Sequence, residues 1–482
     1  MSSPDIRIVG GGLAGCEAAL QLAARGHAVT LHEMRPAVPT PAHEGGGLAE
    51  IVCSNSFKSG DPATGSGLLK DELDRLGCRL LAIAREHAVP AGAALAVDRE
   101  RFSAAVEAAI AAEPLITVSR DEVTTLDVAP GRWWIVATGP LTSASLQEQL
   151  AALTGQDGLH FFDAIAPTVT LESLDLDVLY RASRYGKGEA DYLNAAMDEA
   201  QYAAFHDALM AAERLPVKDF DRADLFDGCQ PVEEIAAGGP QSLCFGPLRP
   251  VGLHDPVTGK RPHAVVQLRQ ENAEGTLYGL VGFQTRLKWG EQKRVFGMIP
   301  GLQNAEFVRL GQMHRNFYVD TPRVLRPDFA LRAEPSIRLA GQITGVEGYV
   351  ESIAGGLVTA LHLHAELSGR RLPPWPYTTI LGALHHGFLF DDTSERLTPM
   401  NANFGILPEL DRKVKGKRER KLAKRDIALQ DLDLWLQMLQ DQEAGLDDED
   451  DDAAAPDAVA GQDGLADDDP LPDAGDEAAP RP

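Results

Sequence analysis

Apolar residues near the N-terminus follow two different spacings, which together predict three consecutive elements. Residues 6–9 form a short apolar strand pattern, and residues 15–25 carry the spaced alanines and leucines of a helix. Gly26 ends that helix, and residues 28–33 return to a strand pattern. The order strand, helix, strand predicts a βαβ unit with parallel strands.

Later segments repeat these patterns. Residues 133–137 and 337–341 are apolar strands that each run into a glycine turn, and residues 351–368 have helical spacing. Strand-like segments at 264–269 and 277–283 interrupt them in a region of mixed pattern. Further helical patterns cover residues 67–87, as one helix or a pair, and residues 429–439.

The first predicted turn carries a G-x-G-x-x-G motif between a strand and a helix. Its residues are Gly10, Gly11, Gly12, Leu13, Ala14 and Gly15. Such a turn lets the backbone approach a pyrophosphate closely and points the free amides of the helix N-terminus at it. Glu33 ends the second strand, where a carboxylate accepts hydrogen bonds from an adenosine ribose. The motif, its flanking elements and this acid predict a dinucleotide-binding site.

Two further glycine turns favour FAD over NAD as the dinucleotide. One strand ends at Gly139, and another enters a turn with Gly341, Gln342 and Gly345. They resemble later elements of two-dinucleotide-fold flavoproteins, in which the second contacts the ribityl chain and often has Asp where Gln342 stands. Each turn alone also fits an ordinary strand end. Their order, near the two ends of the chain, predicts an FAD domain with an insertion.

We therefore expect an α/β fold in which a Rossmann-like FAD-binding domain, of the two-dinucleotide-fold flavoprotein type, is interrupted by an α+β insertion domain. A chain of 482 residues is too long for one compact domain. The expected boundaries are 1–165 for the first part of the FAD domain, 166–319 for the insertion and 320–440 for the second part. Residues 441–482, rich in Asp, Ala and Pro, are expected to form a disordered acidic tail.

The chain has five cysteines, an odd and sparse set that does not predict disulfides or a metal site. Cys16, Cys78 and Cys244 have no motif context and are expected to pack as apolar residues. Cys53 follows a glycine-rich loop, and Cys229 lies in an exposed Gly-Cys-Gln-Pro turn. Thiolates can add to electron-poor ring carbons, although composition alone favours a structural role for both residues.

Motifs spread along the chain resemble those of the bacterial TrmFO family, the folate- and FAD-dependent tRNA uracil-5-methyltransferases. They are IRIVGGGLAG at 6–15, VCSNS at 52–56, ATGPLTS at 137–143, FFDAIAP at 161–167, SRYGKGEADYLN at 183–194, FDGCQPVEE at 226–234, MHRNFYVDTP at 313–322, AGQITGVEGYVES at 340–352 and PMNANFG at 399–405. The resemblance covers about residues 5–440. Ala195 and Ala196 stand where the family usually has Cys-Pro.

The resemblance implies a reaction. Reduced FAD takes a methylene unit from 5,10-methylenetetrahydrofolate, carries it to C5 of uridine 54 in the tRNA T-loop and supplies the electrons that make it a methyl group. NADH or NADPH re-reduces the flavin, and the sequence does not separate the two. Uracil C5 becomes nucleophilic only after a thiolate adds at C6.

The same resemblance assigns residues to this reaction. Cys229 is the expected nucleophile and Cys53 lies beside the flavin, although the two roles could be exchanged. His314 matches a position expected to stack on the folate pterin, with an ordinary buried or surface histidine as the alternative.

The charge distribution gives RNA a place to bind despite a net charge of -26. Residues 412–425 hold nine Lys/Arg and one acid, whereas residues 441–482 hold 16 Asp/Glu and one Arg. Lys413, Lys415, Lys417 and Arg418 are expected to bind tRNA phosphates, and a solvated helix face is the alternative. The acidic tail is expected to compete with RNA for the basic stretch.

Two other classes of function remain open at this point. One is a flavin oxidoreductase acting on a small molecule or a related flavin-dependent enzyme acting on another RNA. The other is an RNA-binding folding helper with a vestigial flavin. The N-terminus shows no secretory signal and no apolar run is long enough to span a membrane, so a cytoplasmic enzyme without an obligate protein partner is expected.

Overall fold

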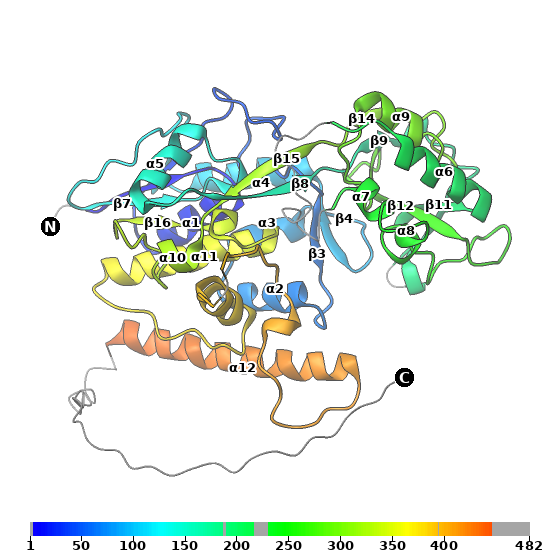
Figure 1. The fold of residues 1–482 in the computed structure, drawn as a ribbon. Helices are drawn as coiled ribbons and strands as arrows, with labels where there is room; N and C mark the ends of the chain where they lie inside the picture. Colours follow the sequence, from blue (N-terminus) through cyan, green and yellow to red (C-terminus); the bar gives the residue numbers. More distant parts are fainter. Residues whose placement is uncertain (1–2, 187–188, 216–229, 394, 446–482) are drawn as a thin grey trace, which may run out of the picture. The chain divides into compact units, whose positions relative to one another are not determined.

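The computed structural model describes residues 3–186, 189–215, 230–393 and 395–445, with residues 161–163 described by their backbone alone. Residues 1–438 form one compact unit and residues 439–482 a second. The first unit contains a parallel sheet, a large antiparallel sheet and two small sheets (Figure 1).

The parallel sheet has the strand order β16-β7-β1-β2-β6. Its strands are Ile337–Leu339 (β16), Arg132–Val136 (β7), Asp5–Val9 (β1), Val29–His32 (β2) and Ile116–Ser119 (β6). Helix α1 (Leu13–Ala24) joins β1 to β2, and nine of the eleven residues from Leu13 to Ala23 are apolar or small, which suits its nearly complete burial. The βαβ unit predicted from residues 6–33 is confirmed.

Helix α11 (Tyr349–Leu367) packs against α1 (Figure 1). A side chain on Gly356 of α11 would collide with the carbonyl oxygen of Ala14. Glycine at this position therefore lets the two helix backbones approach closely. The contact brings the late part of the chain, which follows β16, onto the first helix.

A three-stranded antiparallel sheet lies next along the chain, with the order β3-β5-β4. Its elements and the neighbouring helices are Ser56–Ser59 (β3), Ala94–Val97 (β5), Ala88–Val89 (β4), Gly65–Arg75 (α2), Arg79–Glu86 (α3) and Arg99–Ala112 (α4). The helical pattern at 67–87 is thus a pair of helices. Buried Glu17 caps the second of them by accepting hydrogen bonds from the amides of Arg79 and Leu80, at 3.1 and 2.9 Å.

The six-stranded sheet has the order β10-β11-β12-β13-β9-β14, and its neighbouring strands are antiparallel. The strands are Tyr180–Ala182 (β10), Tyr192–Met197 (β11), Ala264–Gln270 (β12), Leu277–Leu280 (β13), Thr168–Thr170 (β9) and Phe307–Arg309 (β14). The strand-like segments at 264–269 and 277–283 are β12 and β13. Ala195, at the departure from the family motif, is buried in β11.

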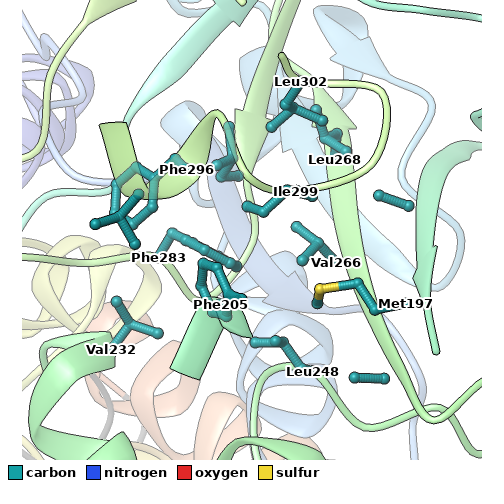
Figure 2. Close-up of a cluster of buried hydrophobic side chains, with 14 of the residues drawn as sticks. Met197, Phe205, Val232, Leu248, Val266, Leu268, Phe283, Phe296, Ile299 and Leu302 are labelled. Atoms are coloured by element: carbon teal, nitrogen blue, oxygen red, sulfur yellow. The ribbon is translucent and has the colours of Figure 1, made fainter. Parts of the chain in front are cut away.

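Helices cover this sheet and bury an apolar core (Figure 2). They are Glu199–Ala211 (α6), Val232–Ala236 (α7), Ser242–Phe245 (α8) and Trp289–Phe296 (α9). Phe205, Phe283 and Phe296 are fully buried at its centre, and the rings of the last two meet edge to face with centroids 5.2 Å apart. Such a core supports the sheet independently of the parallel one.

Two strands and two short helices lie between the sheets in sequence. Strands β8 (Leu159–Ala164) and β15 (Met313–Tyr318) pair with each other, so the chain enters and leaves the antiparallel region side by side. Helices α5 (Ala144–Thr154) and α10 (Thr321–Val324) flank them.

The C-terminal part of the first unit contains a π-helix, Leu381–Gly387, and most of the long helix α12, Lys417–Ala444. Trp435 of α12 stacks on Trp375 with ring centroids 4.1 Å apart. The predicted helix at 429–439 is therefore the second half of a longer one, which also contains most of the basic stretch. It continues to Ala444, beyond residue 441, where we placed the start of the tail; residues 446–482 lie outside the described part.

Within the described ranges, none of the helices combines the length and apolar character that crossing a membrane requires.

Candidate functional site

The turn between β1 and α1 consists of glycines because its backbone leaves little room for side chains. Gly10 has a φ of +105°, and a Cβ on it would lie 2.5 Å from the carbonyl oxygen of Ala137. A Cβ on Gly15 would collide with the carbonyl oxygen of Gly10. A Cβ on Gly12 would meet no atom within 4 Å, so this residue borders open space. A ligand can therefore approach the backbone at Gly12.

The N-terminus of α1 points at the same space. Gly12 is its N-cap residue and no side chain caps the helix there. The first amides of the helix are left without intrahelical acceptors and carry its partial positive charge. A pyrophosphate is the ligand that such a glycine-lined helix end fits best.

A cleft of about 1000 Å³, including its open mouth, extends from this turn. Seven of the predicted cofactor residues line it: Gly10, Gly12, Leu13, Ala14, Glu33, Gly139 and Gln342. Gly139 follows β7 with a φ of +62°, a left-handed conformation that favours glycine. The lining combines glycines of two turns with the carboxylate of Glu33, the groups that a dinucleotide site requires.

The other four predicted cofactor residues are not among the lining residues but belong to the turns next to them. Gly11 donates its amide hydrogen to a carboxylate, and Gly15 packs against the turn. Gly341 has a φ of +76° and approaches Ala14 so closely that a Cβ would lie 2.6 Å from its methyl group. Gly345 has a φ of +92° and packs against Leu397.

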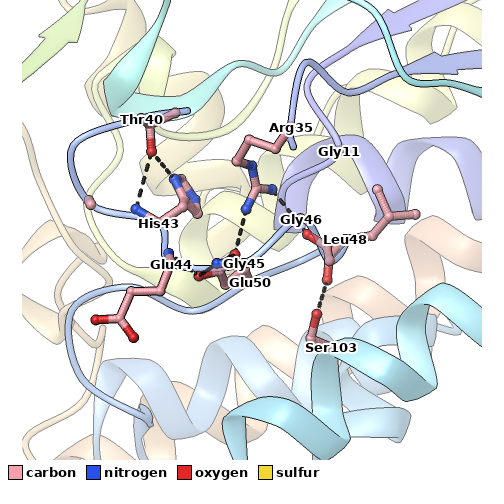
Figure 3. A network of polar contacts seen from close by, with 12 residues as sticks. Gly11, Arg35, Thr40, His43, Glu44, Gly45, Gly46, Leu48, Glu50 and Ser103 are labelled. Carbon is pink, nitrogen blue, oxygen red and sulfur yellow. Dashed lines mark hydrogen bonds and ion pairs between the residues drawn. The ribbon is translucent and has the colours of Figure 1, made fainter. Parts of the chain in front are cut away.

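Glu33 lies directly after β2 and is held by the protein itself (Figure 3 shows its partner Arg35). Its carboxylate accepts hydrogen bonds from the amide of Gly11 at 3.0 Å and from the amide and Nε of Arg35, both at 2.9 Å. Burial alone would raise the pKa of Glu33, but the hydrogen bonds and charge of Arg35 outweigh it and hold the pKa below its ordinary value. Arg35 also bonds Glu50 at 2.7 Å. A ribose that binds Glu33 would hydrogen-bond to a carboxylate that already accepts hydrogen bonds from Gly11 and Arg35.

His32 offers a free polar atom in the lining of the same cleft. Its Nδ1 lies 3.1 Å from a carboxylate oxygen of Asp121. Its Nε2 is buried and has no hydrogen-bond partner in the described part of the chain. A buried nitrogen without a partner costs free energy, and a nucleotide in the cleft would provide one. The residues present therefore fit FAD.

Cys53 lies beside the cleft. Its amide donates a hydrogen bond to the hydroxyl of Tyr349 at 2.9 Å, and Tyr349 and Val52 both line the cleft. Its thiol is partly exposed and lies 3.6 Å from the carbonyl oxygen of Ala164. The structure thus brings one of the two predicted thiols next to the predicted cofactor site. Cys229 lies outside the described residues.

Arg99, the first residue of α4, holds the Cys53 segment from the other side. Its guanidinium donates to the carbonyl oxygens of Ile51 and Cys53, at 2.7 and 3.0 Å, and to the carboxylate of Glu271 at 2.9 Å. Glu271 follows β12 of the antiparallel sheet. The cysteine backbone is therefore fixed by groups from α4, α11 and the antiparallel sheet.

Asn55 adds a second link of the same kind. Its side-chain amide donates to the carbonyl oxygens of Val97 and Gln270, at 2.9 and 3.0 Å, and its oxygen accepts a hydrogen bond from Nε of Arg269 at 2.8 Å. Asn55 is fully buried. A buried amide with these bonds positions its backbone strongly.

The remaining described cysteines differ from Cys53. Cys16 and Cys78 are buried, and burial raises the pKa of both thiols. Cys244 is partly buried beside Tyr202, and burial raises its pKa as well. These thiols are poor nucleophiles, in agreement with the packing role predicted for them.

His314 lies on β15 and is 8% exposed. Burial, followed by the charge of Arg309, lowers its pKa to about 4. Its Nε2 is buried and has no hydrogen-bond partner among the described residues. The imidazole is therefore neutral at neutral pH, and its Nε2 is closed off from solvent.

The basic stretch divides into two groups. Arg418 bonds Asp61 and Arg425 bonds Asp71, both at 2.7 Å, so these side chains attach α12 to the body. Lys413, Lys415 and Lys417 are exposed, and no ion pair is recorded for them within the described residues. Of the four predicted RNA-binding cations, these three remain available for phosphates.

The sequence alone did not identify Tyr349, Arg99 or Glu271 as site residues. Tyr349 contacts Cys53 across 296 positions of sequence. Arg99 and Glu271 carry no motif of their own, and only their contacts with the Cys53 segment reveal a role. The family motif around residue 349 was the one available signal.

A family model described as Glucose inhibited division protein A, GIDA, matches residues 5–371. The methylenetetrahydrofolate--tRNA-(uracil-5-)-methyltransferase TrmFO of Geobacter sulfurreducens is 52% identical over 433 residues, which cover 89% of this chain and 98% of the relative. The TrmFO protein of Bacillus subtilis is 50% identical over 420 residues, covering 87% and 96%.

The solved structure of Aquifex aeolicus GidA superposes with a TM-score of 0.61 at 14% identity, covering 95% of this chain and 79% of that one. At this identity the likeness concerns the fold, and it agrees with the predicted α/β, Rossmann-like architecture. The identity to the TrmFO relatives over nearly their whole length shows that this chain belongs to the TrmFO family.

Proposed function

We propose that this protein methylates C5 of uridine 54 in the tRNA T-loop, with 5,10-methylenetetrahydrofolate as carbon donor and FAD as cofactor. The observation that carries the proposal is the position of Cys53 beside a glycine-lined dinucleotide cleft, with Tyr349 contacting both. A small-molecule oxidoreductase would also need a dinucleotide cleft. It would not need sequence identity to TrmFO proteins over nearly their whole length, so the RNA-modifying enzyme is favoured.

Bound FAD supplies the one-carbon carrier and the electrons of this reaction. Gly12 and the N-terminus of α1 would hold its pyrophosphate, and Tyr349 and Gln342 also line the cleft. Arg99 and Tyr349 fix the backbone of Cys53 next to Val52 and Tyr349, which line the cleft. Cys229 adds to C6 of the uracil, which makes C5 nucleophilic, and Cys53 assists beside the cofactor.

His314 and the basic stretch bind the other reactants. The neutral imidazole of His314 stacks on the folate pterin, and Lys413, Lys415 and Lys417 bind tRNA phosphates with Arg418 beside them. The uridine must leave its T-loop to reach the thiols.

The proposal includes several finer points. NADH or NADPH serves as the reductant, and the reaction takes place in the cytoplasm without an obligate protein partner. The FAD domain comprises residues 1–165 and 320–440, interrupted by residues 166–319; two separate sheets support this division.

The test is a single-turnover assay with the purified full-length protein. Unmodified T-arm RNA is mixed with methylenetetrahydrofolate and reduced enzyme in the absence of S-adenosylmethionine, and 5-methyluridine is measured by mass spectrometry. Appearance of 5-methyluridine that depends on the folate supports the proposal. Flavin turnover without methyl transfer to RNA would instead support the oxidoreductase.

Cysteine variants assign the two thiols. Cys229→Ala is expected to abolish methylation and to leave the flavin spectrum unchanged. Cys53→Ala is expected to reduce methylation in the same assay, while Cys244→Ala, a thiol outside the cleft, serves as the matched control. Full activity of Cys229→Ala with loss in Cys53→Ala would exchange the two roles.

A further inference from the structure

Tyr185 is an exposed aromatic residue in a strained conformation, just after β10. Its side chain is 63% exposed. Its backbone has a φ of 58° and a ψ of 21°, a left-handed conformation that a bulky residue rarely adopts. Residues held in this way persist where the surrounding structure fixes them, and they concentrate at functional positions.

A glycine on a neighbouring loop fixes the ring. The amide of Tyr185 donates a hydrogen bond to the carbonyl oxygen of Gly252 at 3.0 Å. A Cβ on Gly252, whose φ is +85°, would lie 3.0 Å from each of three carbons of the Tyr185 ring. Three equal distances mean that the ring lies with its face on the glycine. Its opposite face is left toward solvent.

Arg184, next to Tyr185 in sequence, places a guanidinium near this ring. Arg184 is fixed by hydrogen bonds from Nε to Gln267 at 2.7 Å and from Nη1 to the carbonyl oxygens of Arg249 and Val251. Arg249 is exposed, whereas the guanidinium of Arg181 donates a hydrogen bond to the hydroxyl of Tyr278 at 3.0 Å. The setting is a rigid aromatic face with fixed positive charge beside it.

Two carboxylates of the same region already have partners. Asp191 accepts a hydrogen bond from the amide of Gly92 at 2.6 Å, and Asp255 accepts from the amide of Val257 at 2.8 Å and from the hydroxyl of Thr258 at 2.9 Å. Their charges are thus partly satisfied by the protein. The exposed side chain of Arg249 remains for an anionic partner.

Adjacent strands connect this position to the thiol site. Ala182 of β10 lies opposite Tyr192 of β11, which lies opposite Arg269 of β12. Arg269 bonds Asn55, two residues from Cys53. Two strand spacings amount to roughly 10 Å, so the strand that leads to Tyr185 and the Asn55 contact lie in neighbouring parts of one sheet, over which an RNA arm can extend.

We propose that the exposed face of Tyr185 is a stacking platform for a nucleobase of the substrate RNA, next to the nucleotide that is extruded for reaction. Single-stranded and loop RNA is bound by stacking unstacked bases on aromatic rings and guanidinium planes, with phosphates on nearby cations. Extrusion of one base leaves its neighbours without a stacking partner, and a rigid ring replaces that partner. This inference rests on the proposed function because it assumes an RNA substrate.

The test measures binding of T-arm RNA to the full-length protein by fluorescence anisotropy over a range of salt concentrations. Tyr185→Gly keeps the left-handed backbone and removes the ring, so it separates stacking from backbone strain. We expect it to weaken RNA binding by roughly tenfold to a hundredfold and to leave the salt dependence unchanged, because stacking neutralises no phosphate. Tyr185→Phe keeps the ring and is expected to bind within about threefold of the unaltered protein.

Two controls complete the test. Tyr377→Ala removes another exposed aromatic side chain, 61% exposed, and is expected to leave RNA binding unchanged. Arg249→Ala is expected to reduce the salt dependence, since it removes a phosphate contact.

Equal RNA affinity of Tyr185→Gly and the unaltered protein would overturn the platform while leaving the proposed function intact. Loss of self-association in Tyr185→Gly without loss of RNA affinity would overturn it in favour of a protein interface. Failure of the unaltered protein to bind T-arm RNA at all would overturn the proposed function as well.

Discussion

Arg99 and Glu271 form an ion pair, 2.9 Å between Nε and the carboxylate, that joins the first residue of α4 to the end of β12. Both side chains are largely buried, with 17% and 7% exposed. The other two guanidinium nitrogens of Arg99 donate hydrogen bonds to the carbonyl oxygens of Ile51 and Cys53. The ion pair therefore couples the position of the Cys53 backbone to that of the antiparallel sheet.

Replacing Glu271 by Gln should weaken this link. Removing one partner of a buried ion pair leaves the other charge uncompensated and costs about 3–5 kcal/mol, so the free energy of unfolding in urea should fall by an amount of that order. With the Arg99 guanidinium less firmly held, the Cys53 segment should open, and alkylation of Cys53 followed by mass spectrometry should become faster. Buried Cys16 and Cys78 are internal references in the same sample.

Gly279→Ala offers an indirect version of the same experiment. A Cβ on Gly279 would collide with the carboxylate of Glu271, so this variant should also speed alkylation of Cys53 without removing a charge. An unchanged alkylation rate in both variants would contradict the positioning role of the pair.

The elements that could be predicted from sequence are those whose signal is local. The βαβ unit and the glycine turn at Gly12 depend on neighbouring residues, and both were placed correctly. Tyr349 and Arg99 could not be assigned because their roles come from contacts made by folding, 296 and 46 positions away from Cys53. The basic stretch was predicted as a phosphate-binding segment, whereas Arg418 is partly engaged with Asp61.

The length of α12 shows a different limit. Its first half is a run of Lys and Arg, which have high helix propensity but little apolar pattern. The hydrophobic pattern therefore indicated only residues 429–439, where Leu432 and Trp435 are buried. Charge alone does not show whether such a run is a helix or an extended segment.

A cluster of buried histidines, which includes His362 and His385, predicts how the free energy of unfolding changes at acid pH. Burial lowers the pKa of His362 and of His385 to about 4. In the unfolded chain these residues titrate near 6.5, so between about pH 4 and 6.5 the unfolded state binds more protons. Stability should therefore be fully present above pH 6.5 and should be lost as the pH falls toward 4, by up to about 3 kcal/mol per histidine.

The check is urea unfolding between pH 4 and 8. His362→Phe removes one titrating group but keeps an aromatic ring beside Phe329, so its stability should depend less on pH than that of the unaltered protein. His254→Phe, at an exposed histidine, is the matched control and should leave the pH dependence as it is. Parallel curves for the unaltered protein and His362→Phe would show that the cluster does not control acid stability.

Lys413, Lys415 and Lys417 predict the salt dependence of RNA binding. Each phosphate contact contributes about 0.7 to 0.9 to the slope of log affinity against log salt. Replacing all three lysines by Ala should weaken T-arm RNA binding at low salt and lower that slope by roughly 2 to 3. Lys293→Ala, an exposed lysine of α9, should change neither quantity; an unaltered slope in the triple variant would place the RNA elsewhere.

Substitutions at Gly12 and Gly15 test two roles of the glycines between β1 and α1 separately. Gly12 leaves space for the ligand, and Gly15 allows close packing of the backbone. Gly12→Ala adds a methyl group to open space and at a negative φ of -79°, so the protein should fold with an unchanged free energy of unfolding in the absence of FAD. That methyl group occupies the approach of the pyrophosphate, so FAD affinity, measured by flavin fluorescence titration, should fall at least tenfold. Gly15→Ala drives its methyl group into the carbonyl oxygen of Gly10 and should instead destabilise the fold by about 1–3 kcal/mol. If Gly12→Ala bound FAD as tightly as the unaltered protein, the pyrophosphate would not lie against this turn, and the cleft would have to hold the cofactor in another way.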